Sequence, residues 1–138
     1  MKQLLQNINK VEYIEPRYLL NVQLVKNDKV VLRYWRNFTS YPLAGLAKVE
    51  VDEAVDDGTR LTTIKLTARA ACLHDFPMRE LCWRVTTVTG EQYLIGLNEQ
   101  PFPVTVVSND FPDSPTDRSG QQVSVTWKTP LSLLRIVD

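Results

Sequence analysis

The chain has 138 residues, of which 43% are hydrophobic and 23% are charged, as is typical of one globular domain spanning residues 1–138. Sixteen Lys and Arg residues balance sixteen Asp and Glu residues, so a nucleic-acid partner is not expected. No stretch reaches the roughly 20 apolar residues of a membrane span, and polar residues interrupt the N-terminal segment where a signal peptide needs an apolar core. We therefore expect a protein kept in a cytoplasm, or assembled there and released by lysis, with no membrane partner.

Two segments near the start of the chain have room for a helix. They are residues 2–10, with the sequence KQLLQNINK, and residues 42–48, with the sequence PLAGLAK. Both helices would be short, because strand patterns dominate the rest of the chain. The sequence therefore predicts little helix.

The first hairpin is predicted between residues 18 and 34, around a turn at residues 26–28. Apolar side chains recur at every second position in both arms, as expected of half-buried strands. The residues that share a face are Tyr18, Leu20, Val22 and Leu24 in the first arm and Val30, Leu32 and Tyr34 in the second. We expect this hairpin to form an exposed edge of the sheet, where its charged turn discourages stray strand pairing.

Two further hairpins follow in the chain. The second turns at Asp57 and Gly58, a favoured tight-turn pair, and the third turns at residues 89–91. The apolar positions are Ala47, Val49, Val51, Ile64, Leu66, Ala68 and Ala70 in the second hairpin and Leu81, Trp83 and Val85 in the third. Polar residues alternate with the apolar ones in the second hairpin, so one of its faces is expected to meet water.

The segment NEQPFP at residues 98–103 interrupts the strand patterns. Proline has no N–H to give to a strand ladder, so Pro101 and Pro103 predict a stiff crossover between two sheets or around a barrel corner. Phe102 is expected to tuck into the core between the two prolines.

Three more strands are predicted after this crossover, at residues 104–107, 121–128 and 133–138. The whole pattern predicts an all-β domain, a single antiparallel β-sandwich or partly open barrel of about eight or nine strands. Trp83 and Trp127 alternate in phase with aliphatic neighbours, and we expect both in the core.

Residues 108–122 form the one long loop of the sequence. Loops of this length in compact domains are often functional, and the prolines of this loop lower the entropy cost of ordering it on a partner. We expect it to dock on another protein, with Asp113, Asp117 and Arg118 among the contacting residues.

An aromatic run follows the first hairpin and includes Tyr34, Trp35 and Tyr41. Tyr, Trp and Arg are enriched at the centres of protein interfaces, so we expect these three residues to bind a partner. The same residues are also the ones that would form a stacking platform for a carbohydrate or another small ligand.

The segment CLHDFPMRELC holds both cysteines and the only histidine of the chain. Zinc takes four ligands, and Cys72, His74 and Cys82 leave the fourth missing unless Asp75 serves. Cys72 and His74 share a strand face and could pair as nucleophile and base, but no orienting third group is evident. The sequence therefore predicts no catalytic residue, metal or cofactor, and two unbridged cysteines.

The C-terminal third of the chain contains a strand ending in YLIG, then NEQPFP, a polar loop with FPDSPTD and a closing strand VSVTW. This stretch resembles small structural proteins of tailed phages and prophages of gut Bacteroidetes. The resemblance implies a virion or tail-assembly component without enzymatic activity, located in the cytoplasm of a bacterial host or in the assembled virion. It assigns no role to any residue.

We therefore expect a non-enzymatic structural protein, a phage or prophage virion or tail component that acts by self-association or docking. Its expected partners are copies of itself or neighbouring virion proteins. One alternative is a ligand-binding β domain with an aromatic stacking surface. Another is a small thiol enzyme that uses Cys72 and His74.

Overall fold

The computed structural model describes residues 2–19, 22–26, 28–32, 38–56, 58–72, 74–110 and 120–137. Strands dominate these residues, which contain no α-helix and one short 3-10 helix, so the all-β prediction is confirmed. The elements are β1 (Lys2–Ile14), η1 (Pro16–Tyr18), β2 (Val22–Lys26), β3 (Lys29–Leu32), β4 (Thr39–Ser40), β5 (Ala47–Asp56), β6 (Thr59–Ala70), β7 (Cys82–Thr87), β8 (Gln92–Ile95), β9 (Val104–Asp110), β10 (Gly120–Thr129) and β11 (Leu134–Ile136).

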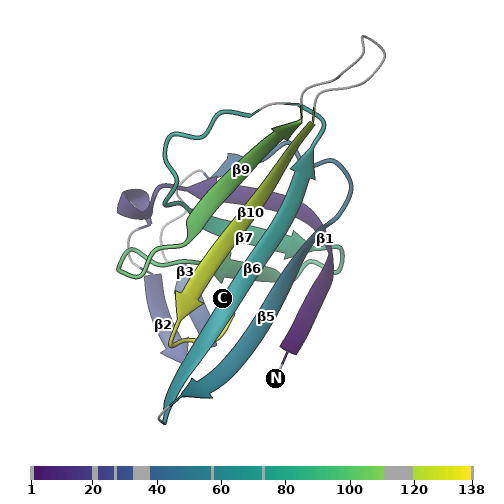
Figure 1. Cartoon of the computed structure of the whole chain (residues 1–138). Helices are drawn as coiled ribbons and strands as arrows, with labels where there is room; N and C mark the ends of the chain where they lie inside the picture. The colour runs from purple at the N-terminus through teal and green to yellow at the C-terminus, as the bar shows by residue number, and fades with distance from the viewer. Residues whose placement is uncertain are drawn as a thin grey trace.

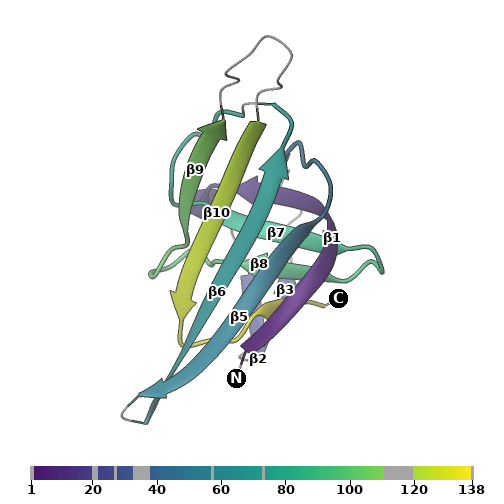
Figure 2. The same ribbon diagram turned by 45° about the vertical axis from the view of Figure 1, so that its right-hand side comes forward.

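The strands form one sheet that folds over on itself (Figures 1 and 2). Its order is β2-β3-β11-β8-β7-β1-β5-β6-β10-β9, with β4 paired to β1 outside this path. One half, β5-β6-β10-β9, lies across the other half, which contains β7, β8, β11, β3 and β2, and β1 belongs to both. The sheet is not closed, which fits the predicted sandwich or partly open barrel, although β11 and β3 pair in parallel.

The first predicted helix, at residues 2–10, is wrong, because this segment is the first part of β1. Lys2–Leu5 pair with β5, and residues 8–14 pair with β7. The register shifts between Leu5 and Ile8, where Asn7 has a φ of 64°. Asparagine tolerates this left-handed conformation better than most residues, so Asn7 allows a single strand to bend from one half of the sheet into the other.

The second predicted helix, at residues 42–48, is also wrong. Ala44 donates its N–H to the Arg69 carbonyl at 2.7 Å, and Leu43 forms an isolated bridge with Ala70. Gly45 has a φ of 80°, a conformation that interrupts a helix and that glycine adopts readily. The segment is therefore an extended connection that runs beside the end of β6 and leads into β5.

The three predicted hairpins are confirmed as β2–β3, β5–β6 and β7–β8. Residues 98–103 form the predicted crossover, because they join β8 in one half of the sheet to β9 at the end of the other. Phe102 is only half-buried, and it is Pro103 that is buried. A Cβ at Gly96 would lie 2.6 Å from Pro103 Cγ, so the close approach of Pro103 to β8 requires a glycine there.

Both predicted core tryptophans are buried, Trp83 at 0% and Trp127 at 1% exposure. The Trp83 indole N–H donates to Thr105 Oγ1 at 3.2 Å, which joins β7 to β9 across the interior. The Trp127 indole N–H donates to the Pro101 carbonyl at 2.9 Å. Each tryptophan thus combines a large buried surface with a hydrogen bond between distant parts of the chain.

A nearly buried ion pair joins β1 to β7. Arg84 donates to Glu12 Oε1 from Nε at 3.0 Å and from its terminal nitrogen at 2.9 Å. The guanidinium carbon of Arg84 also lies 4.1 Å from the centre of the Phe38 ring. Because few water molecules reach either side chain, the Arg84 charge cannot be left without Glu12 at low cost. Glu12 has a second, more exposed partner, since Lys10 Nζ lies 3.9 Å from its Oε2.

Replacing Trp83 or Trp127 with Ala is expected to lower the free energy of unfolding by about 3–5 kcal/mol, because each change leaves a large cavity. Chemical denaturation measures this loss. The exposed neighbour of Trp127 provides the control, since Lys128→Ala should change stability by no more than about 0.5 kcal/mol. A loss below about 1 kcal/mol for either tryptophan would contradict its role in the core.

Breaking the ion pair from one side with Glu12→Gln is expected to cost about 3–5 kcal/mol, because the Arg84 charge then stays buried without a carboxylate. Arg84→Met should cost less, because Lys10 Nζ also lies 3.9 Å from Glu12 Oε2. The double variant Glu12→Leu/Arg84→Met should recover most of the loss caused by Glu12→Gln in the same denaturation experiment. Lys48→Met, which removes the exposed Lys48–Glu50 pair, serves as the control and should cost at most about 1 kcal/mol. Additive losses in the double variant would show that the two side chains are not coupled.

Candidate functional site

Two strands, β2 and β9, stand at the ends of the strand order. Among the described residues, each therefore has one side along which no further strand lies, and such edges are available for pairing with another chain. The expectation that the first hairpin supplies an exposed edge is confirmed by the position of β2. The second edge, β9, was not anticipated from the sequence.

Exposed apolar side chains gather on these two edges. Leu24 and Val25 of β2 are 41% and 52% exposed, and Val106 of β9 is 61% exposed. Val104 and Val107 of β9 are also exposed. Val104 shares a face with Val106, whereas the Val107 side chain points to the opposite face. Val55 and Leu61 are also exposed and lie near the tip of the β5–β6 hairpin. This tip projects from the rest of the sheet (Figure 2).

A groove runs between the free edge of β9 and the segment at residues 74–79. Its volume is about 390 Å³. The groove has an apolar wall of β9 valines, and Phe76 and Met78 contribute apolar surface opposite them. The residues that line it are His74, Asp75, Phe76, Met78, Arg79, Val104, Thr105, Val106, Val107, Asn109 and Gln121.

One hydrogen bond shows to which side of β9 the main-chain N–H and C=O groups of each residue point. The Thr105 N–H donates to the Arg79 carbonyl at 2.8 Å, away from β10. Main-chain groups of an antiparallel strand alternate in direction from residue to residue, so those of Val107 and Asn109 also point into the groove. Residues 74–79 therefore cover the β9 edge at Thr105, whereas Val107 and Asn109 have no adjoining strand in the described part of the chain.

The wall opposite β9 is held in place by Gln121 of β10. Gln121 Nε2 donates to the His74 carbonyl at 2.8 Å and to Asn109 Oδ1 at 3.2 Å. Its Oε1 accepts a hydrogen bond from the Tyr41 hydroxyl at 3.0 Å. These buried bonds fix both sides of the groove to β10, so the groove is a preformed feature of the fold.

His74 packs among aromatic rings behind the groove. Its Nε2 lies 2.6 Å from the Tyr13 hydroxyl, and its ring lies edge-on to Tyr41 and Phe76. Burial raises the pKa of Tyr13, and burial together with the nearby Cys72 raises that of Tyr41 to about 12. Both phenols therefore stay protonated and keep their hydrogen bonds at neutral pH.

The structure corrects the expected role of Tyr41. Tyr41 is only 4% exposed and stacks on Phe76, with 5.8 Å between the ring centres. It therefore supports the groove from behind and does not present its ring to a partner or a small ligand. The sequence around Tyr41 does not indicate this burial, because the hydrogen-bond partner of its hydroxyl is Gln121, 80 residues away.

The other five residues expected to bind a partner lie outside the described residues. They are Tyr34 and Trp35, within residues 33–37, and Asp113, Asp117 and Arg118, within residues 111–119. β9 extends to Asp110 and β10 begins at Gly120. The connection is therefore shorter than the loop predicted at residues 108–122.

The two cysteines are free thiols in different environments. Cys72 is exposed and Cys82 is buried, and burial raises the pKa of the Cys82 thiol to about 12. His74 Nε2 is already engaged by Tyr13. Within the described residues, no cluster of three or more His, Cys, Asp or Glu side chains could hold a metal ion.

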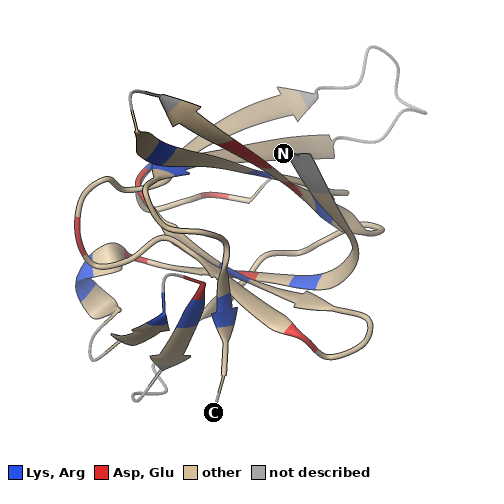
Figure 3. Cartoon of the chain, turned by 90° about the horizontal axis from the view of Figure 1, so that it is seen from below, with Lys and Arg blue, Asp and Glu red and all other residues tan. Residues whose placement is uncertain are grey.

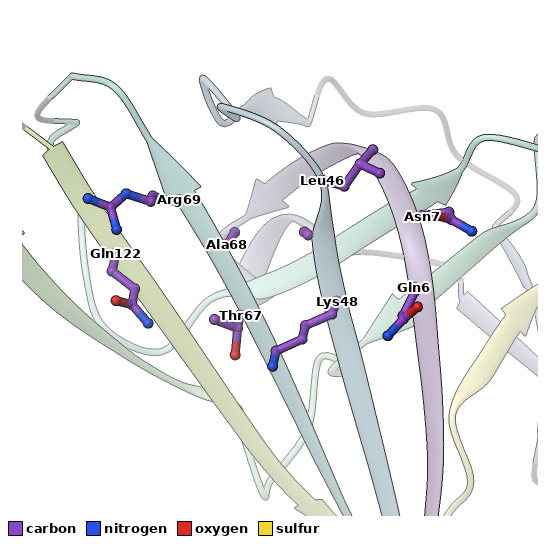
Figure 4. Close-up of a pocket in the computed structure, with 9 residues that line it drawn as sticks. Gln6, Asn7, Leu46, Lys48, Thr67, Ala68, Arg69 and Gln122 are labelled. Carbon is purple, nitrogen blue, oxygen red and sulfur yellow. The ribbon is translucent and has the colours of Figure 1, made fainter.

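A second concave site lies on the outer face of the half of the sheet that contains β5, β6 and β10 (Figure 4). Its volume is about 370 Å³. Lys48, Thr67, Arg69, Gln122 and Gln6 supply most of its polar groups, and its lining residues include no aromatic side chain. In a view from below, basic and acidic residues are interspersed over the ribbon (Figure 3).

No protein-family model, curated protein or solved structure matches the chain. The described residues include no helix that is both long and apolar enough to cross a membrane.

Replacing Gln121 with Leu is expected to lower the free energy of unfolding by about 1–3 kcal/mol, because the buried His74 carbonyl and Tyr41 hydroxyl lose their partner. Hydrogen exchange of the Thr105 amide should also become faster, because the wall that holds this amide is released. The adjacent exposed residue gives the control: Gln122→Leu should leave both measurements near the parent values. Unchanged exchange at Thr105 in the Gln121 variant would show that Gln121 does not hold the groove together.

Proposed function

We propose that this protein is a non-enzymatic assembly component that associates with copies of itself or with neighbouring proteins of a phage or prophage particle, as part of the virion or the tail. The observation that supports this most directly is the gathering of exposed apolar side chains on the two free edges of the sheet. An added strand would bury these side chains and satisfy the main-chain groups in one step.

The composition of β9 favours docking over protection. Soluble proteins often guard an edge with charged residues, proline or a covering segment. β9 has a single charged residue, Asp110 at its end, and only Thr105 is covered by residues 74–79. The rest of β9 presents three exposed valines beside a preformed groove.

The resemblance to phage structural proteins concerns the same part of the molecule. The resembling stretch, from Tyr93 to Ile136, begins within β8 and contains the crossover, β9, β10 and β11. It therefore includes the docking edge and the strand that carries Gln121. This position supports a protein that works by binding other proteins, in the cytoplasm of a bacterial host or in the assembled particle, with no cofactor.

The proposal predicts that the parent protein associates with itself or with a protein encoded beside it, as measured by analytical ultracentrifugation. Val106→Lys should keep the circular dichroism spectrum of the parent and lose this association, because a charge then lies among the exposed valines of β9. The control is Val88→Lys, which changes an equally exposed valine in the β7–β8 turn and should associate like the parent.

If the parent binds neither itself nor a neighbouring protein, or if Val106→Lys assembles like the parent, edge docking is wrong. Ligand binding by the polar pocket of Figure 4 would then become the leading interpretation.

A further inference from the structure

We propose that the strand which docks on β9 is β2 of a second copy, antiparallel to it, with Leu24 of one copy opposite Val107 of the next. This inference rests on the proposed function and specifies its partner and its register. The arrangement joins copies head to tail through the two free edges of the sheet.

The main-chain groups of β2 match those of β9. Val137 donates its N–H to the Val30 carbonyl at 2.9 Å, so the main-chain groups of Val30 face β11. Those of the next residue, Val31, then face β2, where Gln23 is its partner in the register. By the same alternation, the main-chain groups of Val22 and Leu24 face away from the sheet.

Each edge therefore offers two residues, separated by one, whose main-chain groups point outward. On β2 they are Val22 and Leu24, and on β9 they are Val107 and Asn109. Placing Leu24 opposite Val107 and Val22 opposite Asn109 lets both pairs exchange two hydrogen bonds each, as in any antiparallel sheet. The Thr105 N–H, which already donates to Arg79, is not needed.

This same register matches the side chains by chemistry. Val25, the most exposed apolar residue of β2, follows Leu24 and so lies near Val106, the most exposed of β9. The β2–β3 register shifts between Leu24 and Lys26, so the register is set by Val22–Leu24 and not by Val25. Leu24 lies opposite Val107, which is also exposed, and the polar residues Gln23 and Ser108 form a pair. Cross-strand apolar pairs of this kind are the main side-chain contribution to sheet stability.

Other pairings satisfy fewer of these conditions. If β9 pairs with β9 of a second copy around Ser108, Val107 meets Asn109 and Val106 meets Asp110, and both β2 edges stay exposed. A parallel pairing that keeps Leu24 beside Val106 requires the Thr105 N–H, which is occupied by Arg79. Head-to-tail pairing covers both edges, and repeated pairing of this type gives a ring when the rotation closes or a filament when it does not.

Two single variants test the arrangement by mixing. Val25→Lys places a charge on the β2 edge and leaves the β9 edge unchanged. Val106→Lys places a charge on the β9 edge and leaves the β2 edge unchanged. Each variant alone is expected to sediment as a 15.8 kDa monomer, and an equimolar mixture as a heterodimer of twice that mass. The heterodimer forms because one intact β2 and one intact β9 are present. Val88→Lys should assemble like the parent, and circular dichroism checks that every variant is folded.

The outcomes separate this inference from the proposed function. If Val25→Lys assembles like the parent and Val106→Lys does not, β9 binds something other than β2, so the inference is wrong while edge docking stands. If the parent is monomeric but binds a neighbouring protein, the second copy is likewise the wrong partner. A mixture that stays monomeric where the parent assembles also overturns the head-to-tail arrangement.

Cysteine cross-linking tests the register in a Cys72→Ser background, because Cys72 is exposed. A copy with Gln23→Cys mixed with a copy with Ser108→Cys should form a disulfide dimer under mild oxidation, since directly opposite residues meet the distance limits of a disulfide. The matched control replaces Ser108→Cys with Val106→Cys, on the same face but two residues away. Equal or greater cross-linking to the Val106 position would show that the proposed register is wrong.

Discussion

The bend of β1 at Asn7 and Ile8 is the constraint on which the rest of the structure depends. Ile8 is fully buried and pairs with Ala47 of β5 on one side and with Thr87 of β7 on the other. The strand bends there without ending. The two halves of the sheet therefore stay joined, both by the chain of β1 and by its hydrogen bonds to β5 and β7, while one half folds over the other. The same geometry leaves the sheet open, so that β2 and β9 remain as edges.

The two halves are held together across the interior by a small number of polar contacts within an apolar core. Trp83 reaches Thr105 of β9, and Gln121 of β10 binds the carbonyl of His74. The second contact also builds the groove, because it sets the distance between residues 74–79 and the β9 edge. Closing the core and shaping the groove thus both involve Gln121, and a change in this residue should affect both.

The contrast between the two edges explains why they suit each other. β9 lies beside a rigid wall that already covers one of its main-chain donors, so an incoming strand has only a short length to pair with. β2 is a short strand of five residues at the end of a hairpin, and it can enter such a limited space. Pairing between edges with matched apolar positions gives specificity without a large interface.

Much of the fold could be predicted from the sequence, since alternation along a strand shows which residues share a face. This pattern identified the three hairpins and the core positions of Trp83 and Trp127, and the missing N–H of proline identified the corner at Pro101 and Pro103. It could not show which strands become neighbours, because that depends on partners far away in the chain. Lys2–Leu5 became strand and not helix because β5 lies beside them, and Tyr41 was buried because Gln121 reaches it. The groove and the free edge of β9 exist only after β6, β10 and residues 74–79 have been brought together. Side-chain periodicity is a local property that the sequence determines by itself, whereas strand neighbours, edges and grooves are decided by long-range packing in the tertiary structure.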